Sequence, residues 1–232
     1  MYFYTDEKNK LIWGWSAKCG CSHIKNLILE YEGDNSDDIH QIKFWGYLPV
    51  NIDDYDIIIV IRDPFKRIVS GFRDKLSFNG ELREIWEKDL TFSSFVDSIL
   101  KQDKIWRDLH FFHHFCAQTG EGFDSKILES KSLKIFDLEN IDYKYIEEKI
   151  GKKISDKVKN KKKFNNHTQS KKNNDNILEK PVYNLNIDEY DNHKVNYKYF
   201  YDEDLIIKVQ RIYENDFKLA RFANIDYEVP KI

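Results

Sequence analysis

Two stretches of the chain combine a short apolar run, a turn of small or polar residues and a helical repeat of apolar positions. The first run is LIWGW at residues 11–15, followed at once by SAKCGCS at 16–22 and by apolar positions spaced three and four apart. The second run, IIIVI at 57–61, is β-branched and typical of a strand buried on both faces. Two strand–loop–helix units predict an α/β fold whose ligands bind at the carboxyl ends of parallel strands.

The apolar spacing also predicts the remaining elements. Asp63 is typical of an N-cap and Pro64 of a first helical position, so a helix is expected to begin there. The other expected elements are a short strand around Phe44 within 41–50, mostly helical structure over 92–118, a strand over 133–137, a helix over 142–150 that ends at Gly151, and one amphipathic helix over 202–222. We therefore predict a single domain, residues 1–232, with a P-loop-like parallel sheet of about four or five strands and helices on both faces.

Composition and charge narrow the function classes. The chain has 232 residues, of which 41% are hydrophobic, enough for the core of one domain. A net charge of -3 argues against a dedicated nucleic-acid-binding protein. Three cysteines do not make a disulfide framework, and no signal peptide or apolar run of the ~20 residues needed to span a bilayer is present. We expect a soluble, cytoplasmic protein, and the sequence does not indicate its oligomeric state.

The loop after the first apolar run has the chemistry of an anion site. Gly20 and its small neighbours let backbone N–H groups approach an anion, and the N-terminus of the following helix adds its positive dipole end. Lys18 contributes a full charge and Ser22 a hydroxyl donor. The loop lacks the GxxxxGK[ST] pattern, because its lysine precedes its glycine. Such residues favour a phosphate or sulfate site, and an ordinary strand–helix turn is the alternative.

The loop after the second run offers another cation. Arg62 stands at the end of the strand, where its forked guanidinium can hold a second phosphate together with Ser70. The alternative is an ion pair between Arg62 and a carboxylate such as Asp63. Arg67 and Arg73 are expected on the solvated face of the helix.

Both loops resemble those of the membrane-associated carbohydrate sulfotransferases, which include the chondroitin, dermatan and hexuronic-acid O-sulfotransferases. The strings KCGCSHIKNLI (18–28) and IIIVIRDPFKRIVSGFRDKL (57–76) resemble the family's two nucleotide-binding blocks, with Ala17 in place of the usual proline. Further similar stretches are WRDLHFFHHFCAQTG (106–120, with Phe111 in place of a Trp and the family's Pro-Gln lost), KIFDLENID (134–142) and YFYDEDLIIKVQRIYENDFKLARF (199–222). The resemblance covers residues 12–222.

The resemblance implies a donor and a set of residues that bind it. The donor is 3′-phosphoadenosine 5′-phosphosulfate (PAPS), and the product is adenosine 3′,5′-bisphosphate (PAP). Lys18 and Ser22 would hold the 5′-phosphosulfate, and Arg62 and Ser70 the 3′-phosphate. The residues that would supply loop backbone are Cys19, Gly20, Cys21 and His23. The implied reaction is sulfuryl transfer to a hydroxylated acceptor, with carbohydrate as the expected class and with no metal.

Catalysis of this reaction needs a cation at the leaving oxygen and a base for the acceptor hydroxyl. The implied cation is Lys18. Our first candidate for the base is His40, which lies 22 residues before Arg62, and the second is His110. The alternative for His40 is a surface histidine.

The Lys- and Asn-rich segment at about 152–176 is expected to be a mobile loop. A functional interpretation makes it a flap over the nucleotide. Within HTQS and the lysine that follows, Thr168, Ser170 and Lys171 would then contact the donor.

Three competing interpretations stay open at this stage. A metal cluster of His110, His113, His114 and Cys116 is disfavoured, because zinc sites draw three or four ligands from convergent elements. An atypical nucleotide kinase is disfavoured by the missing Walker lysine. A sulfotransferase-like module that binds the nucleotide without turnover is the third.

Overall fold

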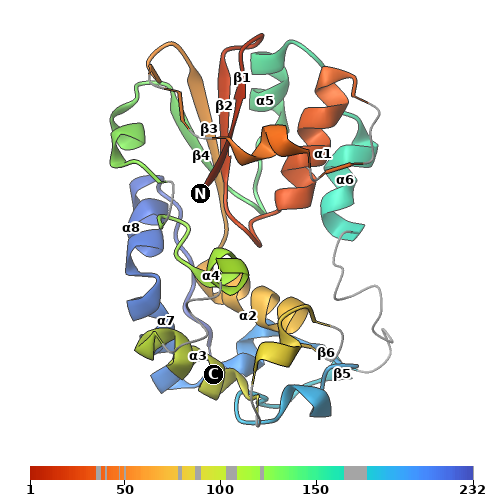
Figure 1. Cartoon of the computed structure of the whole chain (residues 1–232), viewed down its shortest axis with the longest axis vertical. Helices are drawn as coiled ribbons and strands as arrows, with labels where there is room; N and C mark the ends of the chain where they lie inside the picture. The colour runs from red at the N-terminus through yellow and green to blue at the C-terminus, as the bar shows by residue number, and fades with distance from the viewer. Residues whose placement is uncertain are drawn as a thin grey trace. The chain divides into compact units, whose positions relative to one another are not determined.

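The computed structural model describes residues 1–34, 38–39, 41–46, 48–49, 51–77, 80–86, 90–102, 109–120, 123–164 and 177–231. The chain divides into two compact units. The first contains Met1–Arg62, Gln118–Asn165 and Phe222–Ile225, and the second contains Asp63–Ala117, Asn166–Arg221 and Asp226–Ile232. Figure 1 labels the elements of both units.

The first unit is built on a four-stranded sheet of order β1-β2-β3-β4. Its strands are β1 (Tyr2–Asp6), β2 (Leu11–Trp15), β3 (Asp56–Ile61) and β4 (Leu133–Asp137). β2 pairs with β3, and β3 with β4, in parallel, while β1 pairs with β2 antiparallel. The three strands predicted from apolar runs are confirmed. The additional edge strand β1 is antiparallel because a short turn joins it to β2, and only an antiparallel neighbour can follow so short a connection.

Helices α1 (Cys21–Glu32), α5 (Tyr143–Ile150) and α6 (Asp156–Phe164) gather on one side of this sheet (Figure 1). Their apolar side chains form one buried cluster with alternate strand residues. It includes Ile58 and Val60 of β3, Phe136 of β4, Ile24, Leu27 and Ile28 of α1, and Ile146 of α5. The neighbouring β3 residues, Ile57 and Ile59, are also buried, so both faces of β3 are covered, as its continuous β-branched run predicts. A 3₁₀ helix, η4 (Ser125–Glu129), precedes β4 in this unit.

The prediction of a strand within 41–50 is wrong. Residues Ile42–Trp45 form a 3₁₀ helix, η1, and among the described residues of 41–50 Gly46 alone pairs with the sheet, through an antiparallel bridge to Phe3. The buried ring of Phe44 packs against Tyr4 and Trp15, and the neighbouring Lys43 pairs with Glu32 at 2.7 Å and with Asp34 at 3.3 Å. These contacts do not require the alternating side-chain positions of a strand, so a tight turn suffices.

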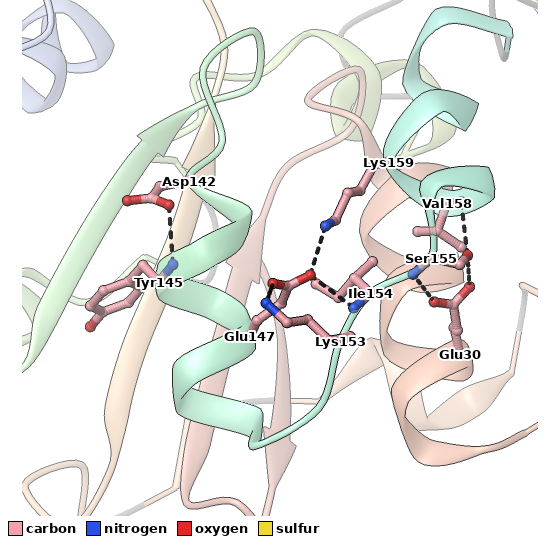
Figure 2. Close-up of polar contacts among 9 residues, drawn as sticks. All are labelled: Glu30, Asp142, Tyr145, Glu147, Lys153, Ile154, Ser155, Val158 and Lys159. Carbon is pink, nitrogen blue, oxygen red and sulfur yellow. Dashed lines mark hydrogen bonds and ion pairs between the residues drawn. The ribbon is translucent and has the colours of Figure 1, made fainter.

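The prediction of a loop over about 152–176 is wrong for residues 156–164, which form the helix α6 (Asp156–Phe164). Two carboxylates bind the start of α6 and hold this Lys-rich segment in place (Figure 2). Glu147 of α5 accepts from the Ile154 N–H at 3.0 Å and pairs with Lys153 and Lys159 at 3.0 and 2.6 Å. Glu30 of α1 accepts from the N–H and the hydroxyl of Ser155 at 2.7 and 2.6 Å. Residues 165–176 lie outside the described residues.

The second unit is mostly helical around an aromatic core. Its elements are α2 (Pro64–Lys75), η2 (Arg83–Ile85), α3 (Phe92–Lys101), α4 (Leu109–Phe115), β5 (Ile177–Leu178), η5 (Ile187–Glu189), β6 (Lys194–Val195), η6 (Tyr197–Phe200), α7 (Glu203–Ile212) and α8 (Glu214–Phe222, whose last residue belongs to the first unit). The rings of Phe72, Phe92, Phe95 and Phe200 contact one another at its centre. No helix in the described part of the chain is long and apolar enough to cross a membrane.

Two predictions for the second unit are corrected by specific side chains. The single helix over 202–222 is divided at Tyr213 into α7 and α8, and the Tyr213 hydroxyl donates to the carbonyl of Phe115 at 2.7 Å. Arg67 is not solvated but only 1% exposed, because its guanidinium donates to the Cys116 carbonyl at 2.8 Å and packs over the Tyr213 ring. Arg73 is half-buried and donates to the carbonyl of His193 at 2.7 Å.

The expected N-cap of α2 is confirmed, since Asp63 accepts from the Phe65 N–H.

The anchoring of α6 predicts a specific acid sensitivity. Hydrogen bonds from Lys159, the Ile154 N–H and Lys153 lower the pKa of Glu147 from its ordinary value of 4.5 to about 2. A carboxyl whose pKa is depressed on folding stabilises the fold fully above the unfolded value and loses this contribution as pH falls toward the folded value. Glu147→Gln should therefore lower the urea midpoint at pH 7, and the difference from wild type should shrink as pH falls from 4.5 to 2.

The matched control is Glu148→Gln on the same helix, where the side chain is exposed and its nearest cation, Lys144, is 3.9 Å away. This variant should match wild type at every pH. A constant deficit for Glu147→Gln between pH 7 and pH 2.5 would contradict the assignment, since it would show that the cost is unrelated to ionisation.

Candidate anion-binding site

The turn between β2 and α1 has an unusual backbone. Lys18 and Gly20 both adopt left-handed conformations, with φ of 65° and 75°. The Cys19 N–H closes the turn by donating to the Ser16 carbonyl at 3.1 Å. A Cβ at Gly20 would lie 2.3 Å from Cδ1 of Leu138, the residue that follows β4. Position 20 therefore favours glycine for its left-handed φ, and a Cβ there would also require the Leu138 side chain to shift.

The N-terminus of α1 differs from those of other helices in the chain. Capping side chains accept from first-turn N–H groups at the start of α2, α3, α5 and α7, namely Asp63, Thr91, Asp142 and Asp202. The N-cap of α1 is Gly20, which has no side chain to do so, and the first turn of α1, described in full, holds no acidic residue. The backbone amides at this end, with the positive end of the helix dipole behind them, suit an anion.

Arg62 comes to this turn from the neighbouring strand. β2 and β3 are parallel and in register, so the residues after both strands lie at the same edge of the sheet. The Arg62 guanidinium donates through Nη1 to the Lys18 carbonyl at 2.9 Å, and both side chains are only partly exposed. The structure thus brings together two predicted site residues, one from each loop, and adds positive charge to the turn.

Gln118 also joins the two loops, a role that the sequence did not suggest. Its side-chain amide pairs with both backbone polar groups of Arg62: Oε1 accepts from the Arg62 N–H and Nε2 donates to the Arg62 carbonyl, each at 2.9 Å. The same Oε1 accepts from the Cys19 thiol at 2.8 Å. The only signal was position, since Gln118 lies in the 106–120 stretch that resembles the sulfotransferases.

The remaining predicted residues of the turn divide into exposed and buried positions. Cys21 and Ser22 are partly exposed at the start of α1, while Cys19 and His23 are buried. The Tyr143 hydroxyl lies 2.8 Å from Nε2 of His23. Burial raises the pKa of Tyr143 to about 12, so its hydroxyl stays protonated at neutral pH and can donate to a neutral imidazole. His23 thus fixes the start of α1 against α5.

Other predicted site residues lie elsewhere or are not described. Ser70 is a partly exposed residue of α2 in the second unit. The predicted base His40, the predicted flap residues Thr168, Ser170 and Lys171, and the side chain of His110 lie outside the described part of the structure. Within the described ranges, no three His, Cys, Asp or Glu side chains are grouped so as to hold a metal ion.

The first unit is thus an α/β unit in which a candidate anion-binding turn follows the first strand of the parallel part of the sheet. The model of the Sulfotransferase family matches residues 1–223, nearly the whole chain, and this chain belongs to that family. Searches of curated proteins and of solved structures give no significant match. The predicted α/β fold with its central sheet flanked by helices is thereby confirmed.

The turn predicts unequal costs for two glycine substitutions in one helix. Gly33, the C-cap of α1, has φ of 76°, like Gly20, but a Cβ there would meet nothing within 4 Å. Gly33→Ala should lower the free energy of unfolding by about 1–2 kcal/mol, the cost of a left-handed L-residue. Gly20→Ala should cost more, because its methyl group must also displace Leu138. Urea unfolding measures both, and equal losses would contradict the close packing described for Gly20.

Proposed function

We propose that this chain is a PAPS-dependent O-sulfotransferase, acting on a hydroxyl group of a carbohydrate or of a small acceptor. The observation that carries the proposal is the N-terminus of α1, which has no side-chain cap and follows a turn in which Arg62 donates to the Lys18 carbonyl, in a chain of the Sulfotransferase family. A donor with phosphate groups at both its 5′ and 3′ positions needs two cationic contacts, and the two loops offer one each.

The first loop suits the 5′ end of the donor. The N–H groups of Gly20, Cys21 and Ser22 would bind the 5′-phosphosulfate, assisted by the Ser22 hydroxyl. Cys19 and His23 would act through the backbone, since their side chains are buried. Arg62 would bind the 3′-phosphate, which distinguishes this donor from ordinary nucleotides.

Three further assignments rest on the family resemblance. Ser70 would contribute to binding the 3′-phosphate. Thr168, Ser170 and Lys171 would contact the nucleotide from the Lys- and Asn-rich segment. These assignments stay predictions, and the binding experiments below do not depend on them.

The reaction is an in-line displacement at sulfur. The acceptor oxygen forms a bond to sulfur while the bond between sulfur and the bridging phosphate oxygen breaks, so that PAP leaves. Negative charge grows on that bridging oxygen, and the Lys18 ammonium would stabilise it. His40 would accept the proton of the attacking hydroxyl. Most of the remaining rate enhancement would come from positioning the two reactants.

Donor binding can be tested without knowing the acceptor. At 100 times its dissociation constant, PAP should raise the free energy of unfolding by about 2.7 kcal/mol, whereas AMP and ATP at the same concentration should do much less. Lys18→Met should abolish most of this stabilisation, and Lys8→Met, at an exposed position in the β1–β2 turn, should retain it. Thermal unfolding with each nucleotide measures both effects. Stabilisation by ATP alone would instead indicate a nucleotide kinase, and stabilisation by none of the three would contradict the proposed donor site.

Turnover separates an enzyme from a binding module. With ³⁵S-labelled PAPS and a panel of glycans and phenols, the wild type should transfer label to a hydroxylated acceptor. His40→Ala should lower that rate by about 10²–10⁴-fold while leaving the dissociation constant of PAP unchanged. Full activity of this variant would contradict His40 as the base. PAP binding without transfer to any acceptor would favour the non-catalytic module.

A further inference from the structure

A buried amide joins the two loops of the proposed donor site. Gln118 is only 1% exposed, and its side-chain amide forms three hydrogen bonds, two with the backbone of Arg62 and one with the Cys19 thiol. Its own carbonyl accepts from the Ser16 hydroxyl at 3.3 Å. The partners therefore lie directly after β2 and directly after β3, and all belong to the first unit.

The pairing with Arg62 imitates a strand neighbour. The ladder between β3 and β4 ends with the Leu138 N–H donating to the Ile61 carbonyl at 2.7 Å. One residue later, the Gln118 amide satisfies both the N–H and the carbonyl of Arg62, as a paired strand would. These two hydrogen bonds constrain the backbone of Arg62 and, with it, the direction in which its side chain leaves the sheet edge.

The contacts form a closed ring. Gln118 holds the Arg62 backbone, the Arg62 guanidinium donates to the Lys18 carbonyl, and the adjacent Cys19 thiol donates back to Gln118. Removing the Gln118 amide would remove its hydrogen bonds both to the Arg62 backbone and to the Cys19 thiol. The two cations then keep their charge but lose the constraint that sets their separation.

We propose that Gln118 is a positioning residue of the donor site, which holds Arg62 at the spacing from the Lys18 turn that a 3′,5′-bisphosphorylated nucleotide requires. The inference rests on the proposed function. Gln118 touches no ligand in this account. It acts through Arg62, so its loss should affect recognition of the 3′-phosphate more than recognition of the 5′-phosphate.

The chemistry of the amide gives a test that a general loss of packing would not reproduce. Gln118→Glu keeps the shape and can still accept from the Arg62 N–H and the Cys19 thiol. An ionised carboxylate cannot donate to the Arg62 carbonyl, whereas a protonated carboxyl can. The defect should therefore be present at high pH and be repaired as the introduced carboxyl is protonated.

The measurement is the ratio of the dissociation constants of AMP and PAP between pH 5 and pH 8.5, expressed relative to wild type at each pH, so that titration of the ligands cancels. At pH 8.5 this ratio should fall by about 10- to 100-fold in Gln118→Glu, as when a side chain that orients a ligand-binding group is lost. It should recover toward the wild-type value at low pH. The control Gln210→Glu, at an exposed position on α7, should follow wild type throughout.

A second variant covers the case in which a buried carboxylate prevents folding. Gln118→Met keeps the length and remains neutral but offers no amide, so its preference for PAP should be low at every pH. Wild-type preference in Gln118→Met, or in a folded Gln118→Glu at pH 8.5, would overturn the inference while leaving the proposed function intact. Failure of the wild-type chain to prefer PAP over AMP would contradict the proposed function and the inference with it.

Discussion

Parallel pairing of β2 with β3 and of β3 with β4 is the constraint on which the candidate site depends. In-register parallel strands end at the same edge, so the segments after Trp15, Ile61 and Asp137 meet there although they are far apart in the chain. Each of these segments supplies one part: the Lys18 turn, Arg62, and Leu138, which packs on Gly20. Without that register, neither cation would have a fixed position relative to the start of α1.

The positive character of this sheet edge comes from its two cations and equally from the lack of a capping side chain at the N-terminus of α1. Helices α2, α3, α5 and α7 each bind one of their first N–H groups with an Asp or Thr side chain, but α1 begins at a glycine. Gly20 has no side chain to accept from these amides, the first turn of α1 holds no acidic residue, and a Cβ at Gly20 would meet Leu138. The turn is held on one side by the contact of buried His23 with Tyr143. On the other side it is held by the hydrogen bonds that link Gln118 to Cys19 and Arg62. The turn is thus held in shape by contacts within the chain, which would lower the entropic cost of binding the proposed nucleotide.

The sequence predicted those parts whose cause is local. Short apolar runs located β2, β3 and β4, and the Asp63-Pro64 pair located the start of α2, because burial and capping act over a few residues. Features with distant causes were missed. Helix α6 depends on Glu30, 125 residues before Ser155, and the partners of Gln118 lie 56 and 99 residues away. Likewise, Arg67 looked solvated, because no local pattern reveals the Cys116 carbonyl that receives it.

The central claim is that the amides at the start of α1 and the Arg62 guanidinium bind the two ends of one nucleotide. A crystal structure of the chain with adenosine 3′,5′-bisphosphate tests this most directly. We expect the 5′-phosphate within hydrogen-bonding distance of the N–H groups of Gly20, Cys21 and Ser22 and of the Lys18 ammonium, with the 3′-phosphate at Arg62. A bound nucleotide whose phosphates contact none of these groups would contradict it.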